Sequence, residues 1–130
     1  GTTRPFFRMA LLTFLLIPVG AIAQNATTSL LRELADKHGA PFSMNAGKKT
    51  WFKKVEDRSC TSCHSESVHA KGSHIKTGKV IEPMAPSVNP KRLTDIKKMK
   101  KWFLRNCKWT YNRECTAKEK GDILVWLQLQ

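Results

Sequence analysis

The stretch Arg58-Ser-Cys60-Thr-Ser-Cys63-His64 contains the most specific pattern in this sequence, Cys-x-x-Cys-His. In an exported protein this pattern is typical of covalent haem attachment. One turn of helix places the two thiols beneath the two vinyl groups of a porphyrin, and the adjacent histidine then lies on the axis through the iron. We therefore predict one haem c per chain, bonded to Cys60 and Cys63 and ligated by His64.

Two other uses of such a cysteine pair fit less well. A thioredoxin-like redox site requires a strand followed by a helix in an α/β sheet, and the sequence has no such pattern. A zinc site requires a second pair of ligands at suitable spacing, whereas seven residues separate Cys107 from Cys115. Haem attachment remains the stronger interpretation.

The N-terminal 23 residues have the order of a secretory signal peptide. Arg4 and Arg8 precede a short apolar run, and the small residues Ala21 and Ala23 follow it. An uncleaved membrane anchor is the alternative, but Pro18 interrupts the apolar run, which falls short of the roughly 18 residues that a spanning helix needs. We predict cleavage after Ala23, with residues 1–23 removed and the mature protein in the periplasm.

The charge balance is strongly basic, with a formal net charge of +13. An exported protein rarely meets nucleic acid, so we expect no nucleic-acid partner and instead an acidic redox partner or an anionic membrane surface. A solvated basic face without a partner is the simpler alternative. The lysines of 97–101 are candidates for a docking face, and Lys79 and Arg105 are candidates to pair with haem propionates.

Helical patterns account for most of the remaining chain. Helices are predicted over 27–38, from Ser43 to about Lys54, over 95–105, and from the capping pattern Thr116-Ala-Lys-Glu119 to the chain end. Residues 65–93 show no periodicity, and a loop of that length is expected to wrap a bound group. No strand pattern is present.

These elements predict an all-α fold, a class I cytochrome c-like single domain wrapped around one covalent haem. We place the cytochrome c domain at 40–130 and a helical extension at 24–39. Gly47 and Trp51 are expected to pack where the first helix of the domain crosses the last one, which carries Ile123, Trp126 and Leu127.

The residue on the other side of the iron is less obvious. In small class I cytochromes c this distal ligand is a methionine between the penultimate and final helices. Met84 precedes the penultimate helix, whereas Asn106 is expected directly after it. Asn106 is therefore the side chain best placed to reach the iron, with Met84, His69 and His74 as alternatives.

At this point the chain resembles the sphaeroides haem proteins, oxygen-binding cytochromes c. The resemblance covers roughly residues 43–130 and rests on four stretches: Ser59-Cys-Thr-Ser-Cys-His64, Thr77-Gly-Lys-Val-Ile-Glu-Pro-Met-Ala-Pro-Ser87, Lys101-Trp-Phe-Leu-Arg-Asn-Cys107, and Arg113-Glu-Cys-Thr-x-x-Glu-Lys-Gly-Asp-x-Leu-x-Trp126. It implies that Asn106 is the distal ligand and that Cys107 forms a disulfide with Cys115. It also implies a dihaem cytochrome c or a membrane cytochrome b as electron donor.

An amide oxygen is a weak, hard ligand that holds ferric iron better than soft ferrous iron. Reduction should then release Asn106 and let a small diatomic ligand such as dioxygen or nitric oxide bind. A plain low-spin electron carrier that uses Met84 is one alternative function. A haem enzyme acting on peroxide or nitrogen oxides is another, although no acid–base pair is visible. We expect an electron-transfer and ligand-binding haem protein rather than a turnover enzyme.

Overall fold

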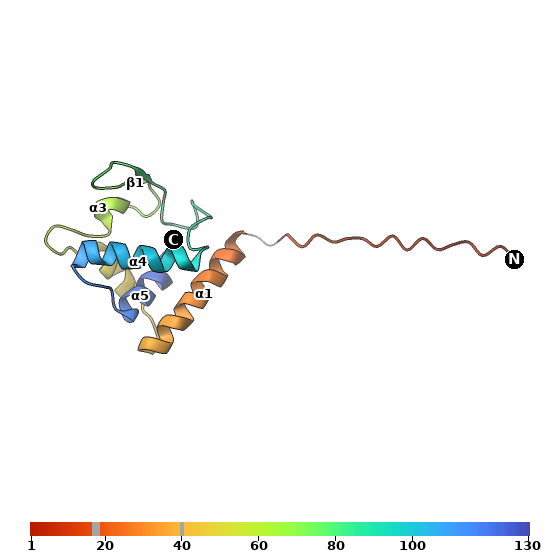
Figure 1. The fold of residues 1–130 in the computed structure, drawn as a ribbon, viewed down its shortest axis with the longest axis horizontal. Helices are drawn as coiled ribbons and strands as arrows, with labels where there is room; N and C mark the ends of the chain where they lie inside the picture. The colour runs from red at the N-terminus through yellow and green to blue at the C-terminus, as the bar shows by residue number, and fades with distance from the viewer. Residues whose placement is uncertain (17–18, 40) are drawn as a thin grey trace.

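The computed structural model describes residues 1–16, 19–39 and 41–130, and within these ranges the domain is built from helices (Figure 1). The elements in chain order are α1 (Val19–His38), α2 (Met44–Phe52), α3 (Thr61–His64), β1 (Gly72–Ser73), β2 (Val80–Ile81), α4 (Ile96–Tyr111) and α5 (Ala117–Leu127). The all-α prediction is confirmed, with one small two-stranded sheet added to it.

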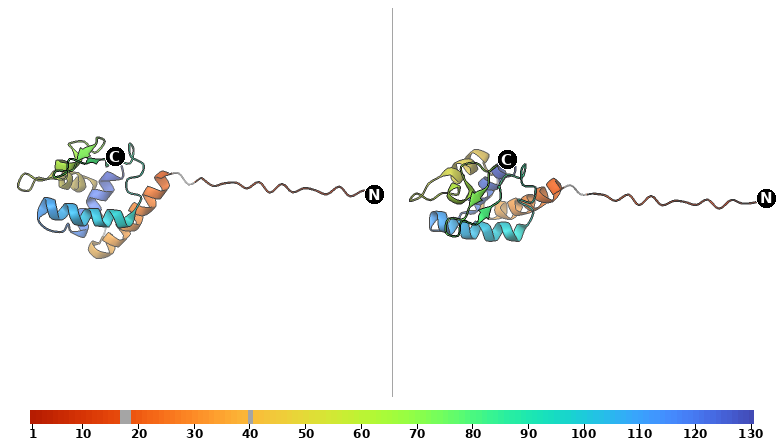
Figure 2. Two further views of the ribbon diagram at one scale, coloured as in Figure 1. Left: turned by 45° about the horizontal axis from the view of Figure 1, so that its top comes forward. Right: turned by 90° about the horizontal axis from the view of Figure 1, so that it is seen from above.

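Residues 1–16 are extended and run away from the helices (Figures 1 and 2). Helix α1 begins at Val19, earlier than the predicted start at Thr27, so the predicted cleavage after Ala23 falls inside it. Among the residues of α1 from Asn25 onward, Thr27, Leu30 and Leu34 are buried against the domain. No helix in the described residues is long and apolar enough to cross a membrane.

Helix α2 crosses α5 at a glycine, as predicted. A Cβ atom at Gly47 would overlap the backbone carbonyl of Asp122 and lie 2.9 Å from the backbone nitrogen of Ile123. The Asp122 carboxylate also accepts a hydrogen bond from the Ser43 amide at 2.7 Å and one from Lys118 Nζ at 2.6 Å. These contacts hold the start of α2 against α5, and Trp51 is buried one turn further along.

The predicted starts of the last two helices are confirmed. Asp95 caps α4 by accepting a hydrogen bond from the Lys98 amide. Thr116 and Glu119 form a reciprocal capping box at the start of α5.

The predicted end of the third helix at Arg105 is wrong. Helix α4 continues to Tyr111 and ends at Asn112, which adopts a left-handed conformation with φ 56°. No proline or glycine lies between Arg105 and Asn112, so nothing in the sequence stops the helix earlier. Asn106 and Cys107 therefore lie inside α4 and not in a loop after it.

The long loop contains a small hairpin that the sequence pattern does not reveal. Strands β1 and β2 pair antiparallel, with Gly72 opposite Ile81 and Ser73 opposite Val80. Strands of two residues are too short for an alternating pattern to be visible. The hairpin lies over α3 and α4, on the opposite side of α4 from α5 in the view of Figure 1.

The packing at Gly47 generates a stability prediction. Gly47→Ala should lower the free energy of unfolding by about 2 kcal/mol, because the new methyl group meets rigid backbone. This loss exceeds the gain of about 1 kcal/mol that alanine brings to a helix interior. Denaturant unfolding of the haem-loaded protein measures the change. Asn45→Ala, at an exposed position in the same helix, is the control and should not destabilise. An equally stable Gly47→Ala variant would contradict the close crossing.

Candidate haem-binding site

The attachment motif forms one helical turn, as predicted. Cys60 is the N-cap of α3, and its carbonyl accepts a hydrogen bond from the His64 amide at 3.1 Å. The Ser59 amide donates to the Ser62 hydroxyl at 3.0 Å and so ties the entrance of the turn to its middle. Cys60 and Cys63 are both half-buried, and neither is in a disulfide. The turn therefore presents two thiols next to an imidazole.

Strand β1 packs directly on this turn. A Cβ atom at Gly72 would overlap the backbone carbonyl of Cys63 and lie 2.8 Å from the Cα atom of His64. Only glycine permits so close an approach of two backbones. The contact fixes the hairpin over the attachment turn.

His64 is buried between two tryptophan rings. Its ring centroid lies 5.3 Å from that of Trp51 and 5.5 Å from that of Trp102. Burial, together with the positive charge of Arg92, lowers the pKa of His64 to about 4. Its Nδ1 atom is buried and has no hydrogen-bond partner among the described residues. The imidazole is therefore neutral at physiological pH, which is the form that binds a metal.

Two cavities adjoin His64, with volumes of about 30 Å³ and about 620 Å³. The larger one is in the range of ordinary ligand pockets, about 300–1,000 Å³. The two cavities have five lining residues in common: Cys63, His64, Trp102, Asn106 and Trp109. Cys60 lines only the smaller one. Asn106 therefore lines the same cavities as the cysteines and the histidine of the attachment motif.

The alternative distal ligands are placed differently. Met84 is 2% exposed and lines a third cavity of about 410 Å³ with Met99. This cavity shares Arg92, Lys98 and Trp102 with the larger one, but His64 does not line it. His74 lines the larger cavity beside His64, and its Nδ1 atom accepts hydrogen bonds from two backbone amides of the hairpin turn. His69 is exposed and lines none of these cavities.

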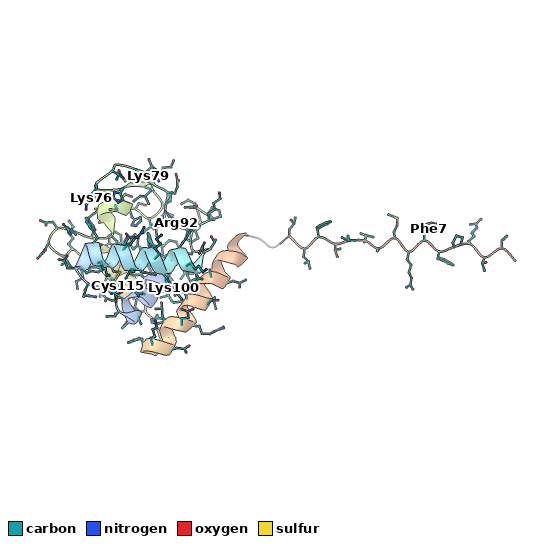
Figure 3. All side chains as sticks on the ribbon, in the orientation of Figure 1. Phe7, Lys76, Lys79, Arg92, Lys100 and Cys115 are labelled. Carbon is teal, nitrogen blue, oxygen red and sulfur yellow. A yellow bond between two sulfur atoms is a disulfide. The ribbon has the colours of Figure 1, made fainter. Side chains whose placement is uncertain are left out.

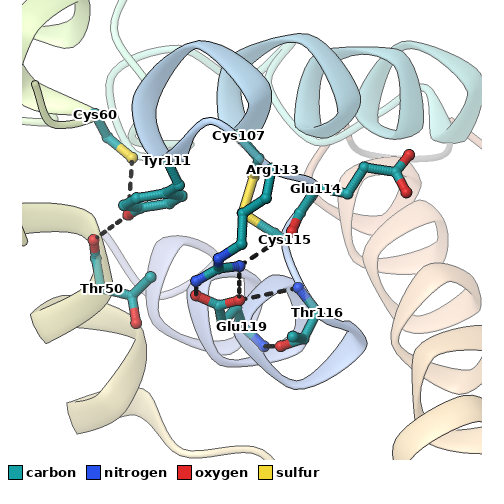
Figure 4. The surroundings of a disulfide bond; sticks show 9 residues. All are labelled: Thr50, Cys60, Cys107, Tyr111, Arg113, Glu114, Cys115, Thr116 and Glu119. Atoms are coloured by element: carbon teal, nitrogen blue, oxygen red, sulfur yellow. Dashed lines mark hydrogen bonds and ion pairs between the residues drawn. A yellow bond between two sulfur atoms is a disulfide. The ribbon is translucent and has the colours of Figure 1, made fainter. Parts of the chain in front are cut away.

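A disulfide joins Cys107 in α4 to Cys115 just before α5 (Figure 4). It forms the pair that the family resemblance implies. One turn beyond Cys107, Tyr111 donates a hydrogen bond to the Thr50 carbonyl of α2 at 2.7 Å, and its hydroxyl lies 4.0 Å from the sulfur of Cys60. Burial raises the pKa of the Cys60 thiol to about 11. The C-terminal part of α4 is thereby tied to α2, to the start of α5 and to the attachment turn.

Known proteins with similar sequences now place the chain in a family. A family model described as a domain of unknown function (DUF1924) matches residues 37–127. The cytochrome c-type protein SHP of Cereibacter sphaeroides is 40% identical over 97 residues, which are 71% of this chain and 74% of SHP. The chain belongs to this family of c-type cytochromes.

Solved structures agree with this membership. The oxidized form of SHP, described as an oxygen-binding cytochrome c, matches with a TM-score of 0.73 and 37% identity, over 80% of this chain and 96% of SHP. Cytochrome c'' of Methylophilus methylotrophus is 38% identical over 72 residues, 55% of this chain and 50% of that protein. Its oxidized crystal structure matches with a TM-score of 0.69 and 28% identity, over 83% of this chain and 94% of that chain. The similarity confirms the cytochrome c-like fold.

As a c-type cytochrome, the protein has haem c as its cofactor. The described residues fit this group in three respects. Two free thiols stand one helical turn apart, a buried neutral imidazole follows them, and a cavity of about 620 Å³ lies alongside. Cys60 and Cys63 are thus suited to hold the porphyrin and His64 to hold the iron.

Sequence reasoning missed three residues of the site. Gly72 and Arg92 lie in the non-periodic loop, and Tyr111 lies beyond the predicted end of its helix. A glycine in a stretch without periodicity gives no sign of a backbone contact with residues 63 and 64. Only the continuation of the helical pattern past Arg105 could have brought Tyr111 to attention.

The cysteine assignments predict a thiol count. All four cysteines of the chain are assigned, two to haem thioethers and two to the disulfide. Thiol titration of the denatured, unreduced holoprotein should find no free thiol, and disulfide reduction should release two. Two free thiols before reduction would contradict either the disulfide or the thioether bonds, and mass spectrometry for retained haem would tell which.

Proposed function

We propose that this cytochrome is a periplasmic monohaem protein that accepts electrons from a partner cytochrome and binds a small diatomic ligand on the reduced iron. Dioxygen and nitric oxide are the ligands that suit the chemistry. The haem supplies the redox change and the open coordination position. The residues of this chain decide when that position opens, and Asn106 is the one we assign to this role.

The observation that carries this proposal is the position of Asn106. It lines both cavities with His64, and it is the only uncharged amide side chain among the described residues that do so. An amide oxygen is a weaker ligand for ferrous iron than a thioether or an imidazole. Asn106 is therefore suited to bind ferric iron and to leave when the iron is reduced.

The helical position of Asn106 makes its release a small movement. Because Asn106 lies inside α4, rotation of its side chain is enough to vacate the site, without rearrangement of a loop. The adjacent Cys107–Cys115 disulfide and the Tyr111 hydrogen bond to Thr50 hold the backbone of α4 in place. The same side chain can then return when the iron is oxidised again.

The relatives support this chemistry. SHP is described as an oxygen-binding cytochrome c, and the solution structure of cytochrome c'' is described as giving insight into haem-ligand detachment. That solution structure matches this chain with a TM-score of 0.68 and 27% identity. Loss of a haem ligand followed by binding of a small molecule is the behaviour that a weak amide ligand would produce.

The electron donor is proposed to be a dihaem cytochrome c or a membrane cytochrome b with an acidic docking surface. The larger cavity is lined by five Lys and Arg side chains and no carboxylate. Lys76 and Lys79 project from the hairpin, on the same side of α4 as Arg92 in the view of Figure 3. The positive potential of these lysines and arginines attracts an acidic surface toward the haem edge. The signal peptide proposed for residues 1–23 and the disulfide are consistent with an oxidising, periplasmic location.

The distal ligand can be tested by substitution. Asn106→Ala should retain covalent haem but make the ferric iron high-spin or water-ligated, while carbon monoxide still binds the ferrous form. Absorption and electron paramagnetic resonance spectra of both oxidation states measure this. Met84→Leu and the exposed Asn45→Ala are controls that should leave the ferric spectrum unchanged. A ferric spectrum altered by Met84→Leu but not by Asn106→Ala would instead favour the ordinary electron carrier.

The proposed docking surface, formed by the lysines and arginines that line the larger cavity, predicts that the rate of reduction depends on ionic strength. The bimolecular rate of reduction by an anionic metal complex should fall about tenfold between low salt and about 0.5 M salt, because screening weakens the attraction. A Lys98→Glu/Lys101→Glu variant, altered at the cavity, should lose most of this dependence. Lys48→Glu/Lys49→Glu makes the same charge change on α2 and should keep most of it. Equal effects of the two double variants would show that net charge alone, and not this surface, controls the rate.

A further inference from the structure

Arg92 occupies an unusual position at the edge of the larger cavity. It lies in the loop before α4 and lines the cavity together with His64 and Asn106. Its Nε atom donates to the Pro83 carbonyl at 3.0 Å, and its Nη2 atom donates to the Glu82 carbonyl at 2.8 Å. Both partners are neutral, and Nη1 has no hydrogen-bond partner among the described residues.

Arg92 forms no ion pair with a carboxylate of the described residues, and the exposed Glu82 carboxylate pairs with Lys71 at 3.8 Å instead. Arg92 is half-buried, and this burial lowers its pKa from the ordinary value, although the negative charge of Glu82 acts in the opposite direction. Burying a cation without a paired anion is unfavourable, so buried charges are normally paired. The position therefore favours the binding of an anion.

We propose that Arg92 is the residue that binds a carboxylate of the haem. Haem c carries two propionate groups, and a guanidinium matches carboxylate geometry better than any other side chain. The two carbonyl bonds hold Arg92 in one orientation before the haem is present, which reduces the entropy lost on binding. This assignment does not depend on which residue is the distal ligand.

The other cations at the cavity are less suited to this role. Lys76, Lys98, Lys101 and Arg105 also line it, but all four are exposed, so their charges are already solvated. Lys79, a candidate from the sequence, is exposed and does not line the cavity. Only Arg92 combines partial burial, fixed orientation and an unpaired charge.

The consequence is a control on the reduction potential. A cation that stays paired with a propionate offsets its negative charge near the iron and favours the ferrous state. The Arg92 amide donates to the Asn89 carbonyl, and the chain reaches the N-cap of α4, Asp95, three residues later. Arg92 is thus a positioning residue. It links the cofactor to the loop before α4, and α4 is the helix that carries Asn106.

The alternative role for Arg92 is purely structural: its two hydrogen bonds to the Glu82 and Pro83 carbonyls would only hold the loop together. The structure offers a matched control for this, because Asn89 Nδ2 donates to the same Pro83 carbonyl at 2.9 Å without any charge. Asn89→Ala weakens the loop but leaves every cation in place. Arg105→Gln removes one positive charge from the cavity lining but leaves the loop intact.

The experiment is spectroelectrochemical titration of the full haem-loaded protein at about pH 5 and about pH 8. A partly buried propionate that has lost its cationic partner has a pKa raised above the ordinary carboxyl value of about 4.3, so it should bind a proton at the lower pH and not at the higher. Arg92→Gln should lower the midpoint potential at the higher pH, where the propionate is ionised and now unpaired. The fall should be much smaller at the lower pH, where the propionate takes up a proton. Arg105→Gln and Asn89→Ala should cause only small changes that are similar at both values. His74 also lines the cavity and is unaltered in all variants.

Arg92→Lys keeps the charge but not the planar fork, so its potential should lie between those of the unaltered protein and Arg92→Gln at the higher pH. If Arg92→Gln does not accumulate as holoprotein, Arg92→Lys alone provides the comparison. A potential in Arg92→Lys equal to that of the unaltered protein, with its pH dependence unchanged, would then overturn the proposal. So would an Arg92→Gln variant that behaves like Asn89→Ala or Arg105→Gln.

Discussion

The rest of the structure depends on keeping His64 buried and uncharged at the end of a one-turn helix. A helix of four residues cannot shield its own last side chain, so the surrounding elements must do so. Trp51 of α2 covers one side of the imidazole, Trp102 of α4 covers another, and β1 lies against the backbone beneath it through Gly72. Each of these elements is in turn held by a contact distant in sequence. Helix α2, for example, is fixed to α5 by the close approach at Gly47.

Helix α4 combines the parts of the site that face His64. Trp102 and Asn106 are four residues apart and line both cavities, while Phe103 and Cys107 are buried and line only the smaller one. The same helix therefore lines the site and contributes to the core of the domain. The distal ligand that we propose, Asn106, is held more rigidly on such a helix than it would be on a loop, as functional groups on helices generally are. This arrangement suits a ligand that must leave and return without disturbing the fold.

Charge is distributed unevenly around the site. Exposed lysines and arginines surround the mouth of the larger cavity, where water screens them, and they act mainly on the approach of other molecules. Arg92 differs because it is partly removed from water and held by two carbonyls. The same type of charge therefore serves two purposes. In our proposals the exposed cations attract an acidic partner, and the half-buried one binds an anion that is part of the bound cofactor.

The amino-acid sequence by itself determined the features that depend on neighbouring residues. The spacing of Cys60, Cys63 and His64 defines a single turn, and Thr116 with Glu119 defines a helix start, because both rest on hydrogen bonds within four residues. The end of α4, the contact at Gly72 and the role of Arg92 were decided only by the tertiary structure. These features depend on which backbones approach each other across the fold and on which charges lose access to water, and no local pattern of residues encodes either quantity.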